Sequence, residues 1–172
     1  MSTIISAAPA LTETAAAVRR ALRAGTDWND AARLVADELR GNLPGLDLLT
    51  SEQRAGGPEG ATGHLLHAEP DGSFSVTAVI WLPGQATRIH DHITWCVVGV
   101  LQGVEHEELF DERLNPIGTA DNHVGEVTGF APPGDIHRIL NTGTENAISL
   151  HVYGTDLSRV GSSVRRYYDT EK

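Results

Sequence analysis

Three histidines in two short segments restrict most strongly what this chain can fold into. His90 and His92 are separated by one residue, and His137 follows the turn-forming run 132–134, Pro-Pro-Gly. Alternate side chains of an extended strand share a face, so His90 and His92 project to the same side, about 7 Å apart at Cα. His-x-His alone is usually a surface feature. Together with a third histidine behind a tight turn, it predicts a mononuclear metal site.

The two segments resemble the two signatures of the cupin superfamily. The first begins at Gly84, and Cys96 occupies the place of the glutamate ligand of that signature, with Gly103 following at the expected spacing. In the second segment, Gly125 lies one residue further from Pro132 than the signature asks. The resemblance implies a double-stranded β-helix whose metal is held by His90, His92 and His137 without a carboxylate.

The order of the predicted elements agrees with a single domain that has an all-β jelly-roll core and N-terminal α-helices. With 172 residues, 40% of them hydrophobic, the chain can bury a full core. Apolar spacing predicts helices over 13–23 and from an Asp27 or Asn29 cap to Gly41. Short alternating or apolar runs predict strands over 75–82, 94–101, 104–110, 125–130, 136–140 and 147–153. We assign 1–58 to a helical segment packing on the barrel, 59–157 to the barrel and 158–172 to a C-terminal tail.

The net charge limits the classes of binding partner, and the cysteine content bears on the cellular compartment. The formal net charge of −10 argues against nucleic acid or an anionic membrane as a partner. No apolar run approaches the about 20 residues of a membrane span, and the N-terminus lacks the basic region of a signal peptide. Cys96 is the only cysteine, so an intrachain disulfide is impossible. We expect a cytoplasmic protein, and its oligomeric state stays open.

A larger set of motifs over about residues 60–168 resembles the cysteine dioxygenase (thiol dioxygenase) family. These motifs are 81–85, 90–92, 101–103 with Glu105 and 107–108, 137–138 and 149–154. The resemblance implies Fe(II) as cofactor and a small thiol that O2 converts to a sulfinic acid. Three neutral imidazoles leave the ferrous charge uncompensated, which suits an anionic thiolate because the ion lowers the pKa of a thiol.

The same resemblance implies roles for four further residues. Ser149, His151 and Tyr153 share one face of the last strand, and in the family such a series orients the phenol toward the substrate. A core hydrogen-bond ladder is the alternative reading. Cys96 lies four residues after His92, so we expect it on the same face of one continuous strand. It is either a small buried hydrophobe or the partner of Tyr153 in a thioether crosslink, as in some family members.

The residues that would bind the substrate depart from the family pattern. Cysteine-specific members carry an Arg, and related bacterial members a Gln, where this chain has Gly63 and His64. The run 164–166, Val-Arg-Arg, resembles the carboxylate-binding segment of bacterial 3-mercaptopropionate dioxygenases. Arg166 is therefore the first candidate for the substrate carboxylate, with Arg88 and His64 as lesser candidates and a solvated tail cation as the alternative for Arg166. We expect a small carboxylated thiol, 3-mercaptopropionate-like in preference to cysteine-like.

Two other functions agree with a histidine metal site in a cupin. One is a metalloenzyme that acts on a non-thiol substrate, and the other is a non-catalytic metal-binding or sensor protein. Thiol-dependent O2 uptake distinguishes a thiol dioxygenase from the first. Absence of turnover in fully iron-loaded protein would favour the second.

Overall fold

The computed structural model describes residues 9–24 and 27–168. Within them, every helix precedes the strands except α4, which lies between the last two strands. The helices are α1 Pro9–Ala24, α2 Trp28–Leu39, the 3-10 helix η1 Leu46–Leu48, α3 Ser51–Ala55 and α4 Leu157–Val160. The strands are β1 Thr62–Ala68, β2 Ser75–Trp81, β3 His90–His92, β4 Cys96–Gln102, β5 Val104–Phe110, β6 Pro116–His123, β7 Val127–Phe130, β8 His137–Leu140, β9 Ala147–Tyr153 and β10 Val164–Tyr167.

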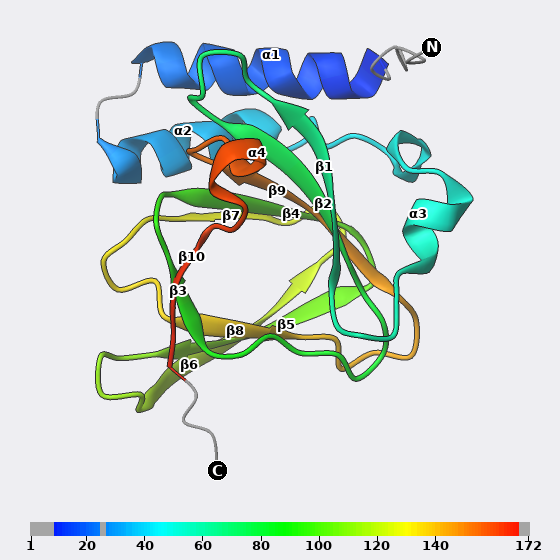
Figure 1. Ribbon diagram of the computed structural model, residues 1–172, viewed down its shortest axis with the longest axis vertical. Coiled ribbons are helices and arrows are strands. Elements are labelled where there is room, and N and C mark those ends of the chain that lie inside the picture. Colours follow the sequence, from blue (N-terminus) through cyan, green and yellow to red (C-terminus); the bar gives the residue numbers. More distant parts are fainter. Residues whose placement is uncertain (1–8, 25–26, 169–172) are drawn as a thin grey trace.

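The strands form two five-stranded sheets whose neighbouring strands all pair antiparallel. One sheet has the order β1-β2-β9-β4-β7 and the other the order β10-β3-β8-β5-β6. The sheets face each other as the two walls of a barrel, with α1 and α2 packed outside the first one (Figure 1). The predicted fold class, a jelly-roll core with N-terminal α-helices, is confirmed.

The two faces of strand β9 differ in their chemistry. Every residue of β9 is buried. Its odd-numbered residues Ser149, His151 and Tyr153 form a polar series, whereas Leu150 and Val152 belong to the apolar cluster shared with the helices. Because side chains alternate along a strand, β9 presents a chemical face to the barrel and an apolar face to the helices.

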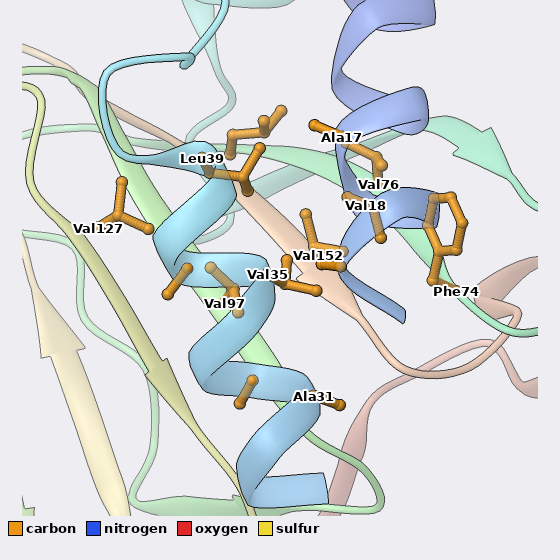
Figure 2. Close-up of a cluster of buried hydrophobic side chains, with 14 of the residues drawn as sticks. Ala17, Val18, Ala31, Val35, Leu39, Phe74, Val76, Val97, Val127 and Val152 are labelled. Carbon is orange, nitrogen blue, oxygen red and sulfur yellow. The ribbon is translucent and has the colours of Figure 1, made fainter. Parts of the chain in front are cut away.

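The helices cover the first sheet through small and β-branched side chains. Of the two caps expected for α2, Asp27 and not Asn29 caps its start, by accepting the Asp30 N–H at 2.8 Å. Val35 and Leu39 of α2 are almost completely buried, and Figure 2 shows Val35 near Val97 of β4. Gly129 of β7 permits this close approach, since a Cβ there would lie only 2.7 Å from the Ala32 carbonyl oxygen.

Strands β6 and β10 were not expected from the sequence. β6 is mostly exposed and lacks an apolar alternation, so no periodic signal marks it. β10 lies within the segment assigned to a C-terminal tail and pairs with β3, which carries two of the three histidines. Throughout the part of the chain that the structure describes, no helix is both long and apolar enough to span a membrane.

The expected continuous strand from His92 to Cys96 is wrong. β3 and β4 belong to different sheets, and the chain passes between them through residues 93–95. In this passage the Ile93 N–H donates to the Ser163 carbonyl at 2.9 Å and the Thr94 hydroxyl to the Gly154 carbonyl at 3.0 Å. Tertiary hydrogen bonds replace strand pairing in this passage. The alternation of side chains along β3 therefore does not continue to Cys96.

Candidate active site

The structure brings the three predicted metal ligands together inside the barrel. His90 and His92 come from β3, and His137 of β8 is the direct register partner of His90. One ring nitrogen from each histidine lies within 4.8 Å of the other two. All three side chains are buried, which is the arrangement of a preformed site for one metal ion.

Each of these imidazoles is held at Nδ1 by an oxygen. His90 Nδ1 lies 2.8 Å from the Arg88 carbonyl oxygen, His92 Nδ1 2.9 Å from Asp135 Oδ2, and His137 Nδ1 2.6 Å from Glu107 Oε1. Such partners hold the proton on Nδ1 and leave Nε2 as the donor toward a metal.

Burial lowers the pKa of two of these imidazoles. It lowers the pKa of His90 to about 4, with His137 as a further cause, and it also lowers the pKa of His92 below its usual value. Burial alone would raise the pKa values of Glu107 and Asp135, but the hydrogen bonds to His137 and His92 outweigh it and leave both lowered. At neutral pH His90 and His92 are therefore neutral, and ionised carboxylates stand behind His92 and His137, a donor set that fits a divalent cation.

A cavity of about 270 Å3 opens beside the three histidines. Its walls are largely apolar, including Val79, Val98, Phe130 and Ile139. This volume lies below the roughly 300 to 1,000 Å3 typical of pockets for drug-sized ligands, so the cavity suits a small molecule.

Ser149, His151 and Tyr153 form a continuous hydrogen-bonded ladder along β9. Ser149 Oγ lies 2.8 Å from His151 Nε2, and His151 Nδ1 lies 2.9 Å from the Tyr153 hydroxyl. Burial lowers the pKa of His151 to about 3, so its ring is neutral. Burial also raises the pKa of Tyr153 well above its usual value, and Tyr153 lines the cavity as a protonated phenol.

Cys96 is completely buried and lies beside Tyr153. The two residues are register partners in the β4–β9 pair. Burial raises the pKa of the Cys96 thiol well above its usual value, and the charges of Glu107, Asp135 and Glu105 add to this effect. Both readings of Cys96, a small hydrophobe and a crosslink partner, stay open.

The three predicted substrate-binding residues are not brought together. Arg166 is the register partner of Asp91, and its Nη2 lies 2.9 Å from Asp91 Oδ2. Asp91 stands between His90 and His92 and so projects to the opposite face of β3, which carries Arg166 away from the cavity. His64 instead contacts the Gln53 carbonyl oxygen at 3.2 Å. The assignment of Arg166 and His64 to the substrate site is therefore corrected.

Arg88 is the candidate that the structure places at the cavity. Its guanidinium lies 4.5 Å from the centre of the Tyr167 ring, and both residues line the cavity. Arg88 is two residues before His90, so the two side chains share a direction. Among the described residues that line the cavity, Arg88 is the only lysine or arginine.

Three acidic residues at the site had no role in the sequence analysis. Asp135 and Glu107 hold His92 and His137, and Glu105 lines the cavity from the same face of β5 as Glu107. The sequence contained a signal for Glu105 and Glu107, because carboxylates two residues apart in a barrel strand point to one side. Which histidine each carboxylate holds depends on strand pairing and could not be read from spacing.

A family model for cysteine dioxygenase type I matches residues 57–167. The chain belongs to the cysteine dioxygenase type I family. The match includes every strand of both sheets and all three histidines. It leaves α1 and α2, which precede residue 57, outside the family region.

Solved structures similar to this cysteine dioxygenase type I family member include an oxalate oxidase in complex with glycolate. That structure is 18% identical, with a TM-score of 0.49, and the match covers 63% of this chain and 59% of the oxidase. An oxalate decarboxylase of Bacillus subtilis is 20% identical, with a TM-score of 0.49 and coverage of 58% and 27%. The protein TT1209 of Thermus thermophilus is 22% identical, with a TM-score of 0.48 and coverage of 62% and 96%. The chain thus spans less than two thirds of the oxidase and of the decarboxylase.

Proposed function

We propose that this protein is an Fe(II)- and O2-dependent thiol dioxygenase that oxidises a small carboxylated thiol to its sulfinic acid. The observation that carries the proposal is a set of three buried, Nδ1-anchored histidines, with no carboxylate ligand among the described residues of the cluster. Family membership over residues 57–167 supports the same reaction class.

The ligand set supports a thiol substrate through its charge. Three neutral imidazoles leave both positive charges of a ferrous ion uncompensated by the ligands, and an anionic thiolate compensates one of them. Bound at His90, His92 and His137, iron would supply a centre at which a thiolate and O2 react. The protein supplies the anchored histidines and a largely apolar cavity beside them.

The cavity supports a substrate of only a few heavy atoms with a carboxylate. A volume of about 270 Å3 leaves room for a short thiol beside the histidines. The carboxylate of such a thiol would be costly to bury unless a cation meets it. Arg88, packed on Tyr167, is the side chain that we assign to this role, and its planar guanidinium suits a carboxylate.

Tyr153 would act on the substrate through its hydroxyl. The phenol is protonated and lines the cavity, and His151 holds its oxygen at 2.9 Å. A fixed O–H group at this place can donate a hydrogen bond to the oxidising sulfur or to oxygen. Ser149 holds the imidazole of His151 in turn.

The test is O2 consumption by the ferrous protein with a panel of small thiols, followed by identification of the products. We expect uptake with 3-mercaptopropionate, weaker uptake with L-cysteine, and a sulfinic acid as the product. Zinc-loaded protein is the control, because it keeps the site filled but has no redox chemistry. Uptake that needs no thiol would indicate a different cupin enzyme. Full iron loading with no turnover of any thiol would favour a binding or sensor protein.

A further inference from the structure

Glu105 is a buried carboxyl that the proposed reaction does not use. Its side chain belongs to β5, lines the cavity and is only 1% exposed. Its Oε1 atom has no hydrogen-bond partner among the described residues. Leaving a buried carboxyl oxygen unpaired costs free energy, so Glu105 calls for a physical explanation.

Two hydrogen-bonding groups from the opposite sheet face this carboxyl. They are the indole N–H of Trp81 on β2 and the hydroxyl of Ser149 on β9, and both lower the pKa of Glu105. The Trp81 N–H is itself buried without a hydrogen bond of ordinary length. Glu105 therefore lies next to the end of the Ser149–His151–Tyr153 ladder, with an unsatisfied donor beside it.

Few other titratable groups act on Glu105. Glu107, on the same strand, raises its pKa, and the main cause of its raised value of about 7 is burial. The charge of Glu105 raises the pKa values of Cys96 on β4 and Tyr153 on β9, and burial keeps both groups protonated. The metal-binding histidines line the same cavity. Near neutral pH, Glu105 can therefore exist in either protonation state while Cys96 and Tyr153 stay protonated.

When Glu105 is ionised, every hydrogen bond of the ladder is donated in the direction from Tyr153 toward Glu105. A carboxylate can only accept, so the Ser149 hydroxyl donates to it. Ser149 Oγ then accepts a hydrogen bond from His151 Nε2–H. The unprotonated Nδ1 of His151 accepts a hydrogen bond from the Tyr153 hydroxyl. In this state the Tyr153 hydrogen points at His151 and not into the cavity.

A protonated Glu105 reverses every hydrogen bond in the series. The Trp81 N–H can only donate, so it takes the carbonyl oxygen of the acid and leaves the O–H to donate to Ser149. Ser149 then donates to His151 Nε2, and His151 Nδ1–H donates to the Tyr153 oxygen. The hydroxyl hydrogen of Tyr153 is then released from His151 and can be donated to a ligand in the cavity, where the Ser163 hydroxyl is a further neighbour of the phenol.

We propose that Glu105 is a positioning residue that sets the direction of the hydrogen bonds along Ser149, His151 and Tyr153. Its acid form turns the Tyr153 hydroxyl into a donor toward the cavity, and its ionised form withdraws that donor. Only the catalytic consequence of this switch rests on the proposed dioxygenase activity. The direction itself is a property of the folded protein.

The direction can be read from the tautomer of His151 by 15N NMR of the zinc-loaded protein. His151 stays neutral because its pKa is about 3, so a change at its two nitrogens reports a tautomer exchange. From about pH 4.5 to 8.5, we expect wild type to change from Nδ1–H to Nε2–H as Glu105 ionises, with a midpoint at or below its metal-free pKa of about 7, because a bound cation favours the carboxylate. A His151 tautomer that stays the same over this range would overturn the proposal.

Glu105→Gln is the decisive variant. Its amide keeps one acceptor for Trp81 and one donor for Ser149, so it imitates the acid form and should hold His151 as Nδ1–H at every pH. Ser149→Ala cuts the ladder and should also abolish the pH dependence, which provides a second route if Glu105→Gln folds poorly. Glu108→Gln is the matched control, because Glu108 pairs with Arg138, and it should titrate like wild type. Tautomer exchange that persists in Glu105→Gln or Ser149→Ala would also overturn the proposal.

Turnover provides a separate measurement if the protein oxidises a thiol. We expect kcat of wild type to fall by at least about tenfold as Glu105 ionises with rising pH, and kcat of Glu105→Gln to stay level. A level wild-type profile with an intact tautomer switch would limit the proposal to structure. Absence of any thiol turnover would reject the proposed function and leave the NMR result standing.

Discussion

Cys96 and Tyr153 lie directly opposite each other on the neighbouring strands β4 and β9. Directly opposed residues of an antiparallel pair project to the same face, with Cβ atoms about 4.5 to 5.5 Å apart. Each side chain influences the pKa of the other, which indicates that the thiol and the phenol are in close range. The register of the β4–β9 pair produces this relationship. It does not depend on a continuous strand from His92 to Cys96, which the structure lacks.

The first prediction distinguishes the two readings of Cys96, because a crosslink partner would form a thioether with Tyr153 in a fraction of the purified, iron-loaded protein. Formation of a bond from sulfur to the phenol ring is a two-electron oxidation in which O2 would take up two hydrogen atoms, so intact mass spectrometry should then detect a lighter species. Cys96→Ser should lack that species, and Tyr153→Phe serves as a second negative control. A lighter species that persists in Cys96→Ser would exclude this pair as its source.

The second prediction is that Tyr153 contributes to turnover more than to folding. Tyr153→Phe keeps the ring that fills the buried position and removes only the hydroxyl that can donate into the cavity. We expect unchanged iron content, a similar Tm and a kcat at least about tenfold lower. Loss of iron or a large fall in Tm would show that the hydroxyl is mainly structural.

The third prediction concerns the pair of His137 and Glu107. His137→Ala should release most of the metal, because it removes one of three ligands. Glu107→Gln removes the charge behind His137 Nδ1 and should weaken metal affinity by about 10- to 100-fold. Metal titration against a competing chelator measures both, with Glu108→Gln, a neighbouring carboxylate paired to Arg138, as the control. Wild-type affinity in Glu107→Gln would contradict this role.

The fourth prediction is that Arg88 recognises the substrate carboxylate. Arg88→Met keeps an apolar stem over Tyr167 and removes the charge, so kcat/KM for 3-mercaptopropionate should fall at least about tenfold. The value for 2-mercaptoethanol, which has no carboxylate, should change little. Arg166→Met is the matched control, since Arg166 pairs with Asp91 on the other face of β3. Equal losses for both thiols in Arg88→Met would contradict the assignment.

The fifth prediction concerns the contact between α2 and β7. Gly129→Ala would place a methyl group 2.7 Å from the Ala32 carbonyl oxygen, so α2 has to shift outward. We expect the free energy of unfolding to fall by about 1 to 3 kcal/mol, measured by urea denaturation. Gly118→Ala, where the new methyl group meets Leu109 at an ordinary 3.8 Å, should be nearly neutral. Similar losses in both variants would show that this close approach is unimportant.

Sequence spacing determined those parts of the protein whose geometry is local. His90 and His92 share a face because alternation is a property of any strand, and the same rule aligned Ser149, His151 and Tyr153. Apolar runs located the strands that bury a face, whereas exposed β6 carried no such signal.

The tertiary structure decided everything that depends on which strand lies beside which. Pairing of β10 with β3 brought Arg166 to Asp91, on the face away from the cavity, and left Arg88 beside the histidines. The passage from β3 to β4 placed Cys96 opposite Tyr153 in another sheet. Packing of the two sheets brought Glu105 to the end of the β9 ladder. Each of these contacts joins residues far apart in the chain, and strand alternation carries no information about such pairings.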